Sequence, residues 1–410
     1  MAALIGRSRL ATNGSDPWRR LFAAACASAI VVSGCSPERL LNRVSGEPEV
    51  VVSPDATALH RSSVVVDLHA DSLLWGRDLA RRSDVGHVDL PRLREGNVAI
   101  QMLTIVTHVP MWLDIERTDE RWPDLITLLA IVNGWPFRTL SSRLERAVFQ
   151  LERFDRLAAA DGRLRAVRSR RDLDELLAAR EADPRWIGVL LGIEGAQALD
   201  GDPENLAGLA DRGLRMVGLA HFFDNDFAGS AHGRAKRGLT DAGRRLVREA
   251  ERLGVLIDLA HSSSATIADV LAWAKKPPIV SHTGVRGTCD NPRNLSDDQL
   301  RAIAGAGGVV GIGFWETAVC GLSAADVARA VRYTVDLVGD RHVALGSDFD
   351  GAVKTPFDAS RLAELTDALL ASGLPEASIR RVLGENAVRL FADVLPRETP
   401  RVPESSSEAG

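Results

Sequence analysis

The chain has 410 residues, of which 45% are hydrophobic and 26% are charged, so it can bury a large core as one large domain or two ordinary ones. Its formal net charge is −5 at pH 7, and no block of basic residues occurs along it. This charge balance argues against a nucleic-acid-binding protein.

The N-terminal residues 1–34 have the pattern of a secretory signal peptide. Two arginines precede the apolar run Leu21 to Val32, which is too short to span a bilayer comfortably. The run ends in Val32-Ser33-Gly34-Cys35, which resembles the lipobox of bacterial lipoproteins, where the cysteine becomes the acylated first residue. The alternative is an ordinary signal peptide with an incidental cysteine. We expect cleavage before Cys35 and a lipid-anchored protein in the bacterial envelope that faces the periplasm.

Both ends of the mature chain are predicted to lie outside the folded domain. Residues 35–61 are polar, contain prolines and show no periodicity, which is typical of a tether. Ser36 follows Cys35 and favours the outer over the inner membrane, by resemblance to the usual sorting rule of lipoproteins. Residues 396–410 are rich in Pro, Glu and Ser and are predicted to be disordered. The expected globular domain is therefore residues 62–395.

Within the expected domain, apolar strand-like runs alternate with amphipathic helical stretches. Eight such runs indicate parallel strands joined by helical crossovers, and hence an α/β fold of the (β/α)8 TIM-barrel type. The segment Trp122–Arg180, after the second strand, is too long for one crossover, and we expect two or three additional helices there that cover the site mouth. The eight predicted strands are Val64–Val66, Val98–Val106, Ile187–Leu191, Arg215–Leu219, Val255–Leu259, Pro278–Val280, Val309–Phe314 and Val343–Leu345.

Two of the crossover helices can be predicted with their ends. Thr240 can cap a helix that runs to Leu253, and Gly254 can stop it before the next strand. The residues from Ser296 to Gln299 have the spacing of a capping box ahead of a helix over Leu300 to Ala306.

Polar side chains that can bind a metal ion follow the predicted strands. His69 and Asp71 come after the first strand, and on an extended backbone residues two apart point the same way, so these two can converge. A single histidine beside a strand is more often structural, but seven candidates at strand ends match the place where a barrel builds its active site. The seven candidates are His69, Asp71, Glu194, His221, His261, His282 and Asp348. The other histidines, which we interpret as surface or supporting residues, are His60, His87, His108, His232 and His342.

Four histidines, two aspartates and one glutamate suit two divalent metal ions such as zinc. Two ions that share a bridging carboxylate can polarise a carbonyl and ionise a bridging water at neutral pH. A carboxylate outside the metal ligands can take and return the proton. The pattern alone thus predicts a binuclear hydrolase and leaves the cleaved bond open.

Several motifs together resemble the membrane (renal) dipeptidase family, whose members are zinc dipeptidases within the amidohydrolase-type barrels. The resemblance runs in order from about Val64 to Leu390. It implies a metallo-dipeptidase in which a hydroxide that bridges two zinc ions per chain hydrolyses small dipeptides. The motifs that carry it are Asp67-Leu68-His69-Ala70-Asp71, Gly192-Ile193-Glu194-Gly195, Ile257-Asp258-Leu259-Ala260-His261-Ser262, Ser281-His282 and Gly346-Ser347-Asp348-Phe349-Asp350-Gly351.

The resemblance also implies how the metal ligands divide between the two ions. His69, Asp71 and Glu194 would hold one zinc ion. Glu194, His261 and His282 would hold the other, so that Glu194 is the bridge.

The resemblance assigns further roles to residues near these ligands. Asp348 would accept the proton, and His221 would stabilise the tetrahedral intermediate. Arg293 would bind the substrate carboxylate, although a loop arginine is more often simply solvated. Cys289 and Cys320 would form a disulfide, as similarly placed cysteines do in the family. The alternative is a pair of buried thiols.

Three features depart from the family pattern. Ala70 stands where the family usually has asparagine, which can loosen the support of the first two ligands. The stretch Phe222 to Asp226 is more acidic and aromatic than expected, and Trp122–Arg180 matches poorly. These differences concern substrate selection more than the metal centre.

Three other classes of protein compete with the dipeptidase. A lactonase or amidase of the amidohydrolase type commonly begins with two histidines one residue apart, whereas this chain has a His–Asp pair. A metal-free binding lipoprotein on the same barrel is an alternative because fold alone does not fix function, but the intact ligand set argues against it. A purely structural envelope protein leaves the polar cluster unexplained. The sequence leaves open whether the chain forms a homodimer.

Overall fold

The structure is a computed structural model that describes residues 37–45 and 50–398. The predicted signal peptide and Cys35 lie outside the described residues. From Glu38 onward the described residues belong to one compact unit. Among them, no helix is both long enough and apolar enough to cross a bilayer.

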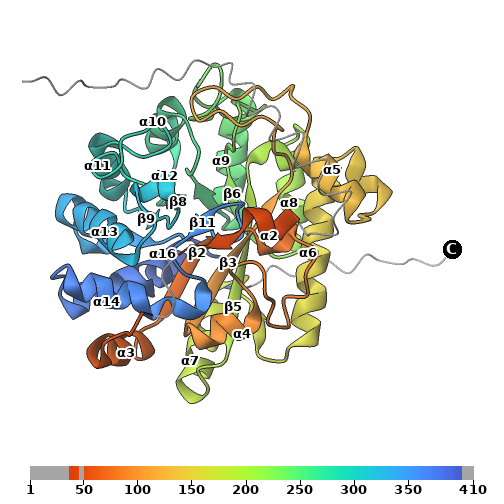
Figure 1. Ribbon diagram of the computed structural model, residues 1–410. Helices are drawn as coiled ribbons and strands as arrows, with labels where there is room; N and C mark the ends of the chain where they lie inside the picture. Colours follow the sequence, from red (N-terminus) through yellow and green to blue (C-terminus); the bar gives the residue numbers. More distant parts are fainter. Residues whose placement is uncertain (1–36, 46–49, 399–410) are drawn as a thin grey trace, which may run out of the picture. The chain divides into compact units, whose positions relative to one another are not determined.

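Eight parallel strands close into a barrel that helices surround (Figure 1). Strand β3 pairs with β2 on one side and with β5 on the other, which closes the sheet and confirms the predicted (β/α)8 fold. All eight predicted strands are present, and a short strand β4 pairs with β5 outside the ring. The strands of this sheet are β2 Val65–Ala70, β3 Val98–Val106, β4 Leu164–Ala166, β5 Ile187–Glu194, β6 Leu214–Gly218, β7 Leu256–Asp258, β8 Ile279–Thr283, β9 Val309–Ile312 and β10 Val343–Leu345. A separate two-stranded sheet pairs β1 Arg43–Val44 with β11 Lys354–Thr355.

The strands carry apolar residues on both faces, as expected of a sheet that is packed on both sides. Every residue of β2, β3 and β5 is buried. Successive side chains of a strand point to opposite faces, and accordingly Val65 and Val66 belong to two different hydrophobic clusters. The cluster around Val66 includes Phe391 of helix α16, whereas the cluster around Val65 includes residues from most of the helices that surround the barrel.

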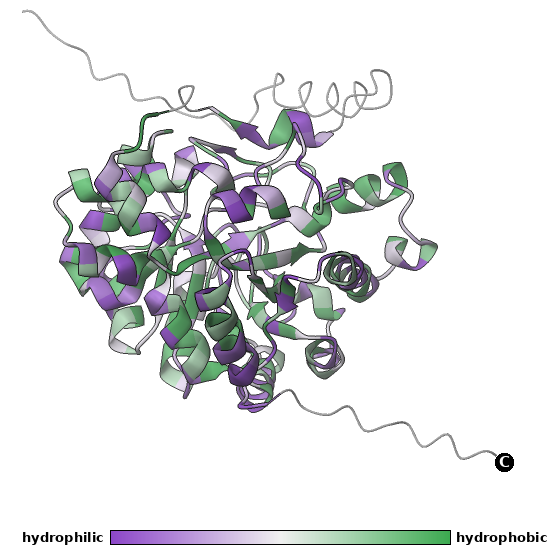
Figure 2. Ribbon diagram, turned by 90° about the horizontal axis from the view of Figure 1, so that it is seen from below, coloured by the Kyte–Doolittle hydropathy of each residue, from purple (hydrophilic) through white to green (hydrophobic). Residues whose placement is uncertain are grey.

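The helices carry both hydrophobic and hydrophilic segments, as expected of elements with one face on a core (Figure 2). The predicted ends of two of them are confirmed. Thr240 accepts a hydrogen bond from the backbone N–H of Gly243, and Gly254 ends the helix in a left-handed conformation. Ser296 and Gln299 form the predicted capping box, although that helix begins at Asp297 rather than Leu300.

The helices are α2 Pro37–Leu41, α3 Pro54–Arg61, α4 Leu90–Glu95, α5 Leu125–Val132, α6 Arg143–Ala160, α7 Arg170–Ala182, α8 Asn205–Asp211, α9 Asp241–Leu253, α10 Ser264–Trp273, α11 Asp297–Gly305, α12 Glu316–Val319, α13 Ala324–Val338, α14 Ala363–Ala371, α15 Glu376–Arg380 and α16 Asn386–Val394. Short 3-10 turns are η1 Ser72–Leu74, η2 Phe137–Leu140, η3 Ala196–Leu199, η4 Asp340–His342 and η5 Ala359–Arg361, and η6 Arg381–Glu385 is a π-helical turn. The additional helices predicted after the second strand are present as α5, α6 and α7.

The prediction of a tether does not hold for residues 37–41, 43–44 and 54–61, because these residues form helix α2, strand β1, which pairs with β11, and helix α3. Ser53 caps the helix, and Ala56, Leu59 and His60 bury one face of it. The His60 ring lies 2.8 Å from the Thr366 hydroxyl and 3.0 Å from the Gly96 carbonyl oxygen. Three buried positions in eight residues give too short a periodic signal to recognise within a polar stretch.

The described part of the predicted C-terminal tail begins in contact with the barrel. The carbonyl oxygen of Pro396 accepts a hydrogen bond from the N–H of Arg170, and that of Arg397 accepts one from Arg171. The folded domain therefore extends slightly beyond residue 395. Residues 399–410 lie outside the described part of the chain.

Candidate active site

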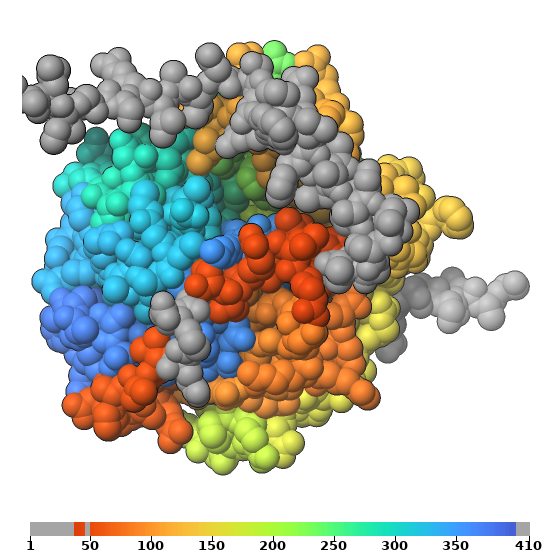
Figure 3. Space-filling model, viewed as in Figure 1, coloured from red at the N-terminus to blue at the C-terminus, as the bar shows by residue number. Residues whose placement is uncertain are grey.

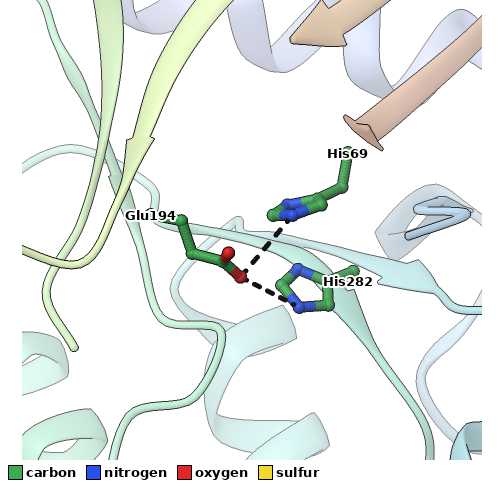
Figure 4. Close-up of side chains that lie close together, drawn as sticks. All are labelled: His69, Glu194 and His282. Carbon is green, nitrogen blue, oxygen red and sulfur yellow. Dashed lines mark ion pairs between the residues drawn. The ribbon is translucent and has the colours of Figure 1, made fainter. Parts of the chain in front are cut away.

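The seven predicted polar residues form one cluster at the C-terminal ends of the barrel strands. His69 lies on β2, Glu194 is the last residue of β5 and His282 lies on β8, and their side chains point toward one another (Figure 4). Asp71 directly follows β2, and His221, His261 and Asp348 each lie three residues after the end of β6, β7 and β10. All seven are buried, with at most 9% of any residue exposed. The strand ends thus gather the predicted candidates at one site.

Glu194 lies at the centre of the cluster. Its Oε1 atom is 3.2 Å from the Nε2 atom of His261, 3.4 Å from that of His282 and 3.5 Å from that of His69. Its Oε2 atom is 3.2 Å from Nε2 of His221. One carboxylate therefore contacts four imidazoles, as a bridging ligand would.

The two aspartates also lie close to His69. Its Nε2 atom is 3.5 Å from Oδ1 of Asp71 and 4.0 Å from Oδ1 of Asp348. The hydroxyl of Thr104, on β3, donates a hydrogen bond of 2.6 Å to Asp71 and holds this carboxylate toward the site. Ala70, which replaces the usual asparagine of the family, is itself fully buried.

Three groups of side chains lie close enough to hold a metal ion, and their donor atoms all fall within 4.8 Å of one another. These groups do not follow the division between two ions that the resemblance implies. His221, expected only to stabilise the intermediate, stands in one group with Glu194 and His261. Asp348, expected as proton acceptor, stands in another with His69 and Asp71. The remaining group is His69, Glu194 and His282.

The spacing of the donor atoms fits zinc. Ligand atoms about 2.0–2.1 Å from a tetrahedral zinc ion lie roughly 3.4 Å from one another. The four distances of 3.2–3.5 Å between Glu194 or Asp71 oxygens and imidazole nitrogens are close to that value. In addition, the Nε2 atoms of His261 and His282 are only 3.0 Å apart, and Nε2 of His69 is buried without a hydrogen-bond partner. A cation among these nitrogens would satisfy all three.

Ser281 fixes the orientation of two of the histidines. Its hydroxyl donates a hydrogen bond of 2.6 Å to Asp258 and lies 3.0 Å from the Nδ1 atoms of both His69 and His282. A hydroxyl has one donor and two acceptor lone pairs, so once it donates to Asp258 it can only accept from the two rings. Both Nδ1 atoms therefore carry a proton, and both Nε2 atoms face Glu194, where each can bind a metal ion once it carries no proton of its own.

The charges of the cluster shift its pKa values strongly. Burial opposes the positive charge of His69, but Glu194 and Asp71 outweigh it and raise the pKa of His69 to about 10. Burial, with a contribution from Asp71, raises the pKa of Glu194 well above its usual value. Burial also raises the pKa of Asp348 to about 8. Perturbed carboxylates and imidazoles in one buried cluster are typical of a functional site.

The pKa values of the other three imidazoles shift in the opposite direction. Burial lowers the pKa of His221, His261 and His282 well below the usual histidine value, and neighbouring positive charges add to the effect. These rings are therefore neutral at pH 7. A neutral imidazole is the form that binds a metal ion.

Arg293 lies beside the cluster as a buried cation. Its NH2 group donates a hydrogen bond of 2.9 Å to the carbonyl oxygen of His282, and its guanidinium carbon is 5.6 Å from the centre of the Trp315 ring. Burial lowers the pKa of Arg293 to about 10, while Asp348 and Glu194 oppose that effect. Arg293 has no ion-pair partner within the described residues, and only 6% of it is exposed.

The backbone at two of the site residues has a positive φ. His261 has φ 59° and Asp348 has φ 62°, which is the left-handed region that non-glycine residues rarely adopt. Such conformations persist where the surrounding structure holds them, and they concentrate at active sites.

Cys289 and Cys320, on the loops after β8 and β9, form a disulfide with a Cα–Cα distance of 5.3 Å.

Sequence analysis missed three residues that support the site. Ser281 and Asp258 stand inside recognised motifs, but no role followed from their positions. His232 was interpreted as a surface or supporting residue, yet it is buried and its ring centre lies 5.2 Å from that of His261. Its Nδ1 atom lies 2.9 Å from the Ile115 carbonyl oxygen, which links the loop after β3 to the loop after β6. The Gly-Ser-Ala-His spacing after the His221 loop was the only available signal.

The acidic stretch after His221 has a structural explanation. Asp224 accepts hydrogen bonds from the backbone N–H groups of Ser230 and Ala235 and so shapes the loop. The Phe222 ring packs against those of His221 and His261, with centres 4.1 and 5.1 Å apart. In this departure from the family pattern, the aromatic residue Phe222 therefore lines the site, and the acidic residue Asp224 shapes the loop.

Comparison with known proteins identifies the family of the chain. The profile of the membrane dipeptidase family (peptidase family M19) matches residues 54–400. Dipeptidase aclJ of Aspergillus oryzae is 35% identical over 221 residues, which are 52% of this chain and 52% of that protein. The chain thus spans about half the length of this curated relative.

Solved structures show the same fold. A metallopeptidase from Rhodobacter sphaeroides, solved with a phosphinate mimic of the dipeptide L-Ala-D-Ala, is 26% identical with a TM-score of 0.64, over 81% of this chain and all of that one (100%). Dipeptidase AC, a metallopeptidase of family M19, is 27% identical with a TM-score of 0.65, over 82% of this chain and 99% of that one. Since the family profile covers residues 54–400, well over half of the chain, the chain belongs to the membrane dipeptidase family, peptidase family M19.

Proposed function

We propose that this protein hydrolyses dipeptides with two zinc ions. The observation that carries the proposal is Arg293, a buried cation beside the cluster with no carboxylate partner within the described residues. An uncompensated buried charge is costly, and a carboxylate bound there would offset that cost. A planar guanidinium can bind a carboxylate bidentately. The free C-terminal carboxylate of a dipeptide supplies this group one residue beyond the cleaved bond.

Each residue of the cluster has its own role in the proposed reaction. Two zinc ions, held by the histidines and carboxylates around Glu194, would polarise the scissile carbonyl and activate water at neutral pH. Asp348, whose carboxylate lies 4.0 Å from Nε2 of His69, would take a proton from the attacking water and pass it to the leaving amine. His221 can donate a hydrogen bond to the carbonyl oxygen as negative charge develops there. Arg293 holds the substrate in place by its carboxylate.

The relatives support the substrate class. The Rhodobacter sphaeroides metallopeptidase was solved with a mimic of L-Ala-D-Ala. We therefore include dipeptides with a D-residue in the second position in the proposed substrate range. Arg293 contacts the backbone of His282, so the bound carboxylate and the ligand cluster are held at a fixed and short separation.

The proposal includes export and lipid anchoring. The apolar run of residues 21–32 and the lipobox-like Val-Ser-Gly-Cys at residues 32–35 support acylation of Cys35, with the barrel in the periplasm. Ser36 favours the outer membrane. A Cys35→Ala protein that still fractionates with membranes would refute lipid anchoring.

Metal analysis together with a substrate panel tests the catalytic proposal. Protein purified with zinc should hold about two zinc ions per chain and should cleave dipeptides of both L,L and L,D configuration. Glu194→Gln should lose both ions, because one carboxylate serves the two. Full activity with fewer than two ions would contradict the binuclear centre. Turnover of lactones in preference to dipeptides would instead favour another amidohydrolase-type activity.

A further inference from the structure

Exposed apolar side chains lie on the α2–β1 segment and on two segments that follow β3. The α2–β1 segment exposes Leu40 (47%), Leu41 (45%) and Val44 (40%). It lies in front of β2 and β3 in Figure 1, and Figure 3 shows it at the surface of that same face. The loop after β3 adds Trp112, Leu113 and Ile115, and α5 with η2 adds Ile131, Val132 and Phe137. In contrast, Trp273 is exposed at the C-terminal end of α10, which lies toward the opposite end of the barrel.

The α2–β1 segment is held firmly on the site end of the barrel. Glu38 is buried and forms an ion pair with Arg77, which also pairs with Asp350. The side-chain oxygen of Asn42 accepts a hydrogen bond of 2.8 Å from the N–H of Ala352. These contacts tie the segment to the loop that carries Asp348, so its exposed side chains keep a fixed direction relative to the active site.

Two cations flank the exposed apolar residues of this segment. Arg43 on β1 lies opposite Lys354 on β11 in the parallel register, and both are exposed. Neither has an ion-pair partner within residues 37–45 and 50–398. Neighbouring like charges on paired strands are unfavourable unless an anion lies across from them. Apolar side chains together with unpaired cations are the combination that binds an anionic lipid surface.

We propose that a patch formed by Leu40, Leu41, Arg43, Val44 and Lys354 lies against anionic phospholipid headgroups, so that the open end of the barrel faces the membrane. The inference rests on the proposed acylation of Cys35. Cys35 precedes Glu38 by three residues, and three residues of extended chain reach about 10 Å at most. Because Glu38 is bound to the barrel through Arg77, the acyl chains must enter the membrane within that reach of Glu38, which stands two residues before Leu40 of the patch.

Site-specific labelling of the acylated protein tests this orientation. Once Cys35 is acylated and Cys289–Cys320 is a disulfide, an introduced cysteine is the only free thiol of the mature chain. Leu41→Cys and the matched control Trp273→Cys would each carry a fluorophore in vesicles of phosphatidylethanolamine and phosphatidylglycerol with a nitroxide-labelled lipid. The nitroxide should quench the label at position 41 strongly and the label at position 273 little. Equal quenching at both positions, or none at either, would overturn the orientation.

A second pair of variants separates the patch from its tether. A flexible Gly/Ser segment inserted between Ser36 and Pro37 removes the short reach but keeps the anchor. Quenching at position 41 should persist in this variant, and its loss would show that the patch has no affinity of its own. With the long linker in place, Arg43→Glu together with Lys354→Glu should lower the docked fraction, because two basic residues contribute about 30-fold to affinity for an anionic surface. Unchanged docking would overturn the role of the cations.

The readouts distinguish this inference from its premises. If Cys35 carries no lipid by mass spectrometry, the anchoring proposal fails and the labelled protein does not bind the vesicles. If Cys35 carries lipid and position 41 is not quenched, anchoring stands and the orientation fails. Energy transfer between labels at position 41 of two copies in detergent would assign the patch to a second copy of the chain instead and would also overturn the inference.

Discussion

The hydrogen bonds of Ser281 make a sharp prediction about metal affinity. Replacing Ser281 with alanine removes the acceptor for the Nδ1–H groups of both His69 and His282 and leaves Oδ2 of Asp258 without its donor, while Oδ1 keeps its backbone N–H donors. Each buried N–H left unpaired costs about 1–3 kcal/mol. Loss of a residue that orients metal ligands typically lowers metal affinity about 10–100-fold. Ser281 orients two of the three ligands in the group of His69, Glu194 and His282, so Ser281→Ala should weaken zinc binding there by that factor.

Competition against a zinc-binding fluorescent chelator would measure this affinity directly. A nearby residue provides the matched control: Ser262 follows His261, is buried, and its hydroxyl has no hydrogen-bond partner. Ser262→Ala should therefore leave zinc affinity nearly unchanged. If both variants lose the same affinity, the effect comes from packing and not from the hydrogen bonds of Ser281. If Ser281→Ala binds zinc as tightly as the native protein, the assignment of its acceptor role is wrong.

Four further predictions follow from the site. Arg293→Leu should weaken kcat/KM for dipeptides by about 2–4 kcal/mol but affect a neutral dipeptide amide much less; equal losses would make Arg293 structural. Asp348→Asn should keep the zinc ions, measured by metal analysis, and lower turnover roughly 10²–10⁴-fold; loss of metal to the same extent would make Asp348 mainly a ligand. In protein freed of metal by a chelator, the pKa of His69 in the folded state, about 10, exceeds the unfolded value of 6.5. The protonated ring therefore stabilises the folded state fully below pH 6.5, and this contribution disappears as the pH rises to about 10. The free energy of unfolding of the metal-free protein, measured with denaturant at several pH values, should fall by at most about 1.4 kcal/mol per pH unit for this one residue. A free energy of unfolding that does not change with pH over this range would contradict the prediction. Finally, titration of unfolded, unreduced protein should find Cys289 and Cys320 unreactive, and reduction should lower the free energy of unfolding by roughly 3–4 kcal/mol; two reactive thiols would rule out the disulfide.

The barrel and its ligand cluster could be predicted because both depend on short-range patterns. Each buried strand is a β-branched or aliphatic run, and the polar residue that ends it falls at a fixed place in the fold. His69, Glu194 and His282 are therefore near one another for a reason that each motif shows separately. The short helix α3 was missed because its buried positions are too few to form a recognisable period.

The supporting contacts could not be predicted because they join residues that are distant in sequence. Ser281 lies 212 residues from His69 and 23 from Asp258. Nothing in a serine before a histidine shows that its hydroxyl will meet two imidazoles and a carboxylate. The position of His221 within a metal-binding group likewise depends on how the loop after β6 folds, which Asp224 and its backbone partners determine.

The left-handed backbone at His261 and Asp348 implies a trade-off between stability and activity. A non-glycine residue in that conformation costs about 1–2 kcal/mol, and a glycine would avoid the cost. Glycine at either position would remove the imidazole or the carboxylate on which the proposed chemistry depends. The most stable backbone at these two positions and the catalytically competent one are therefore encoded by different residues. Screens of this enzyme for thermostability alone should accordingly select glycine there together with loss of turnover.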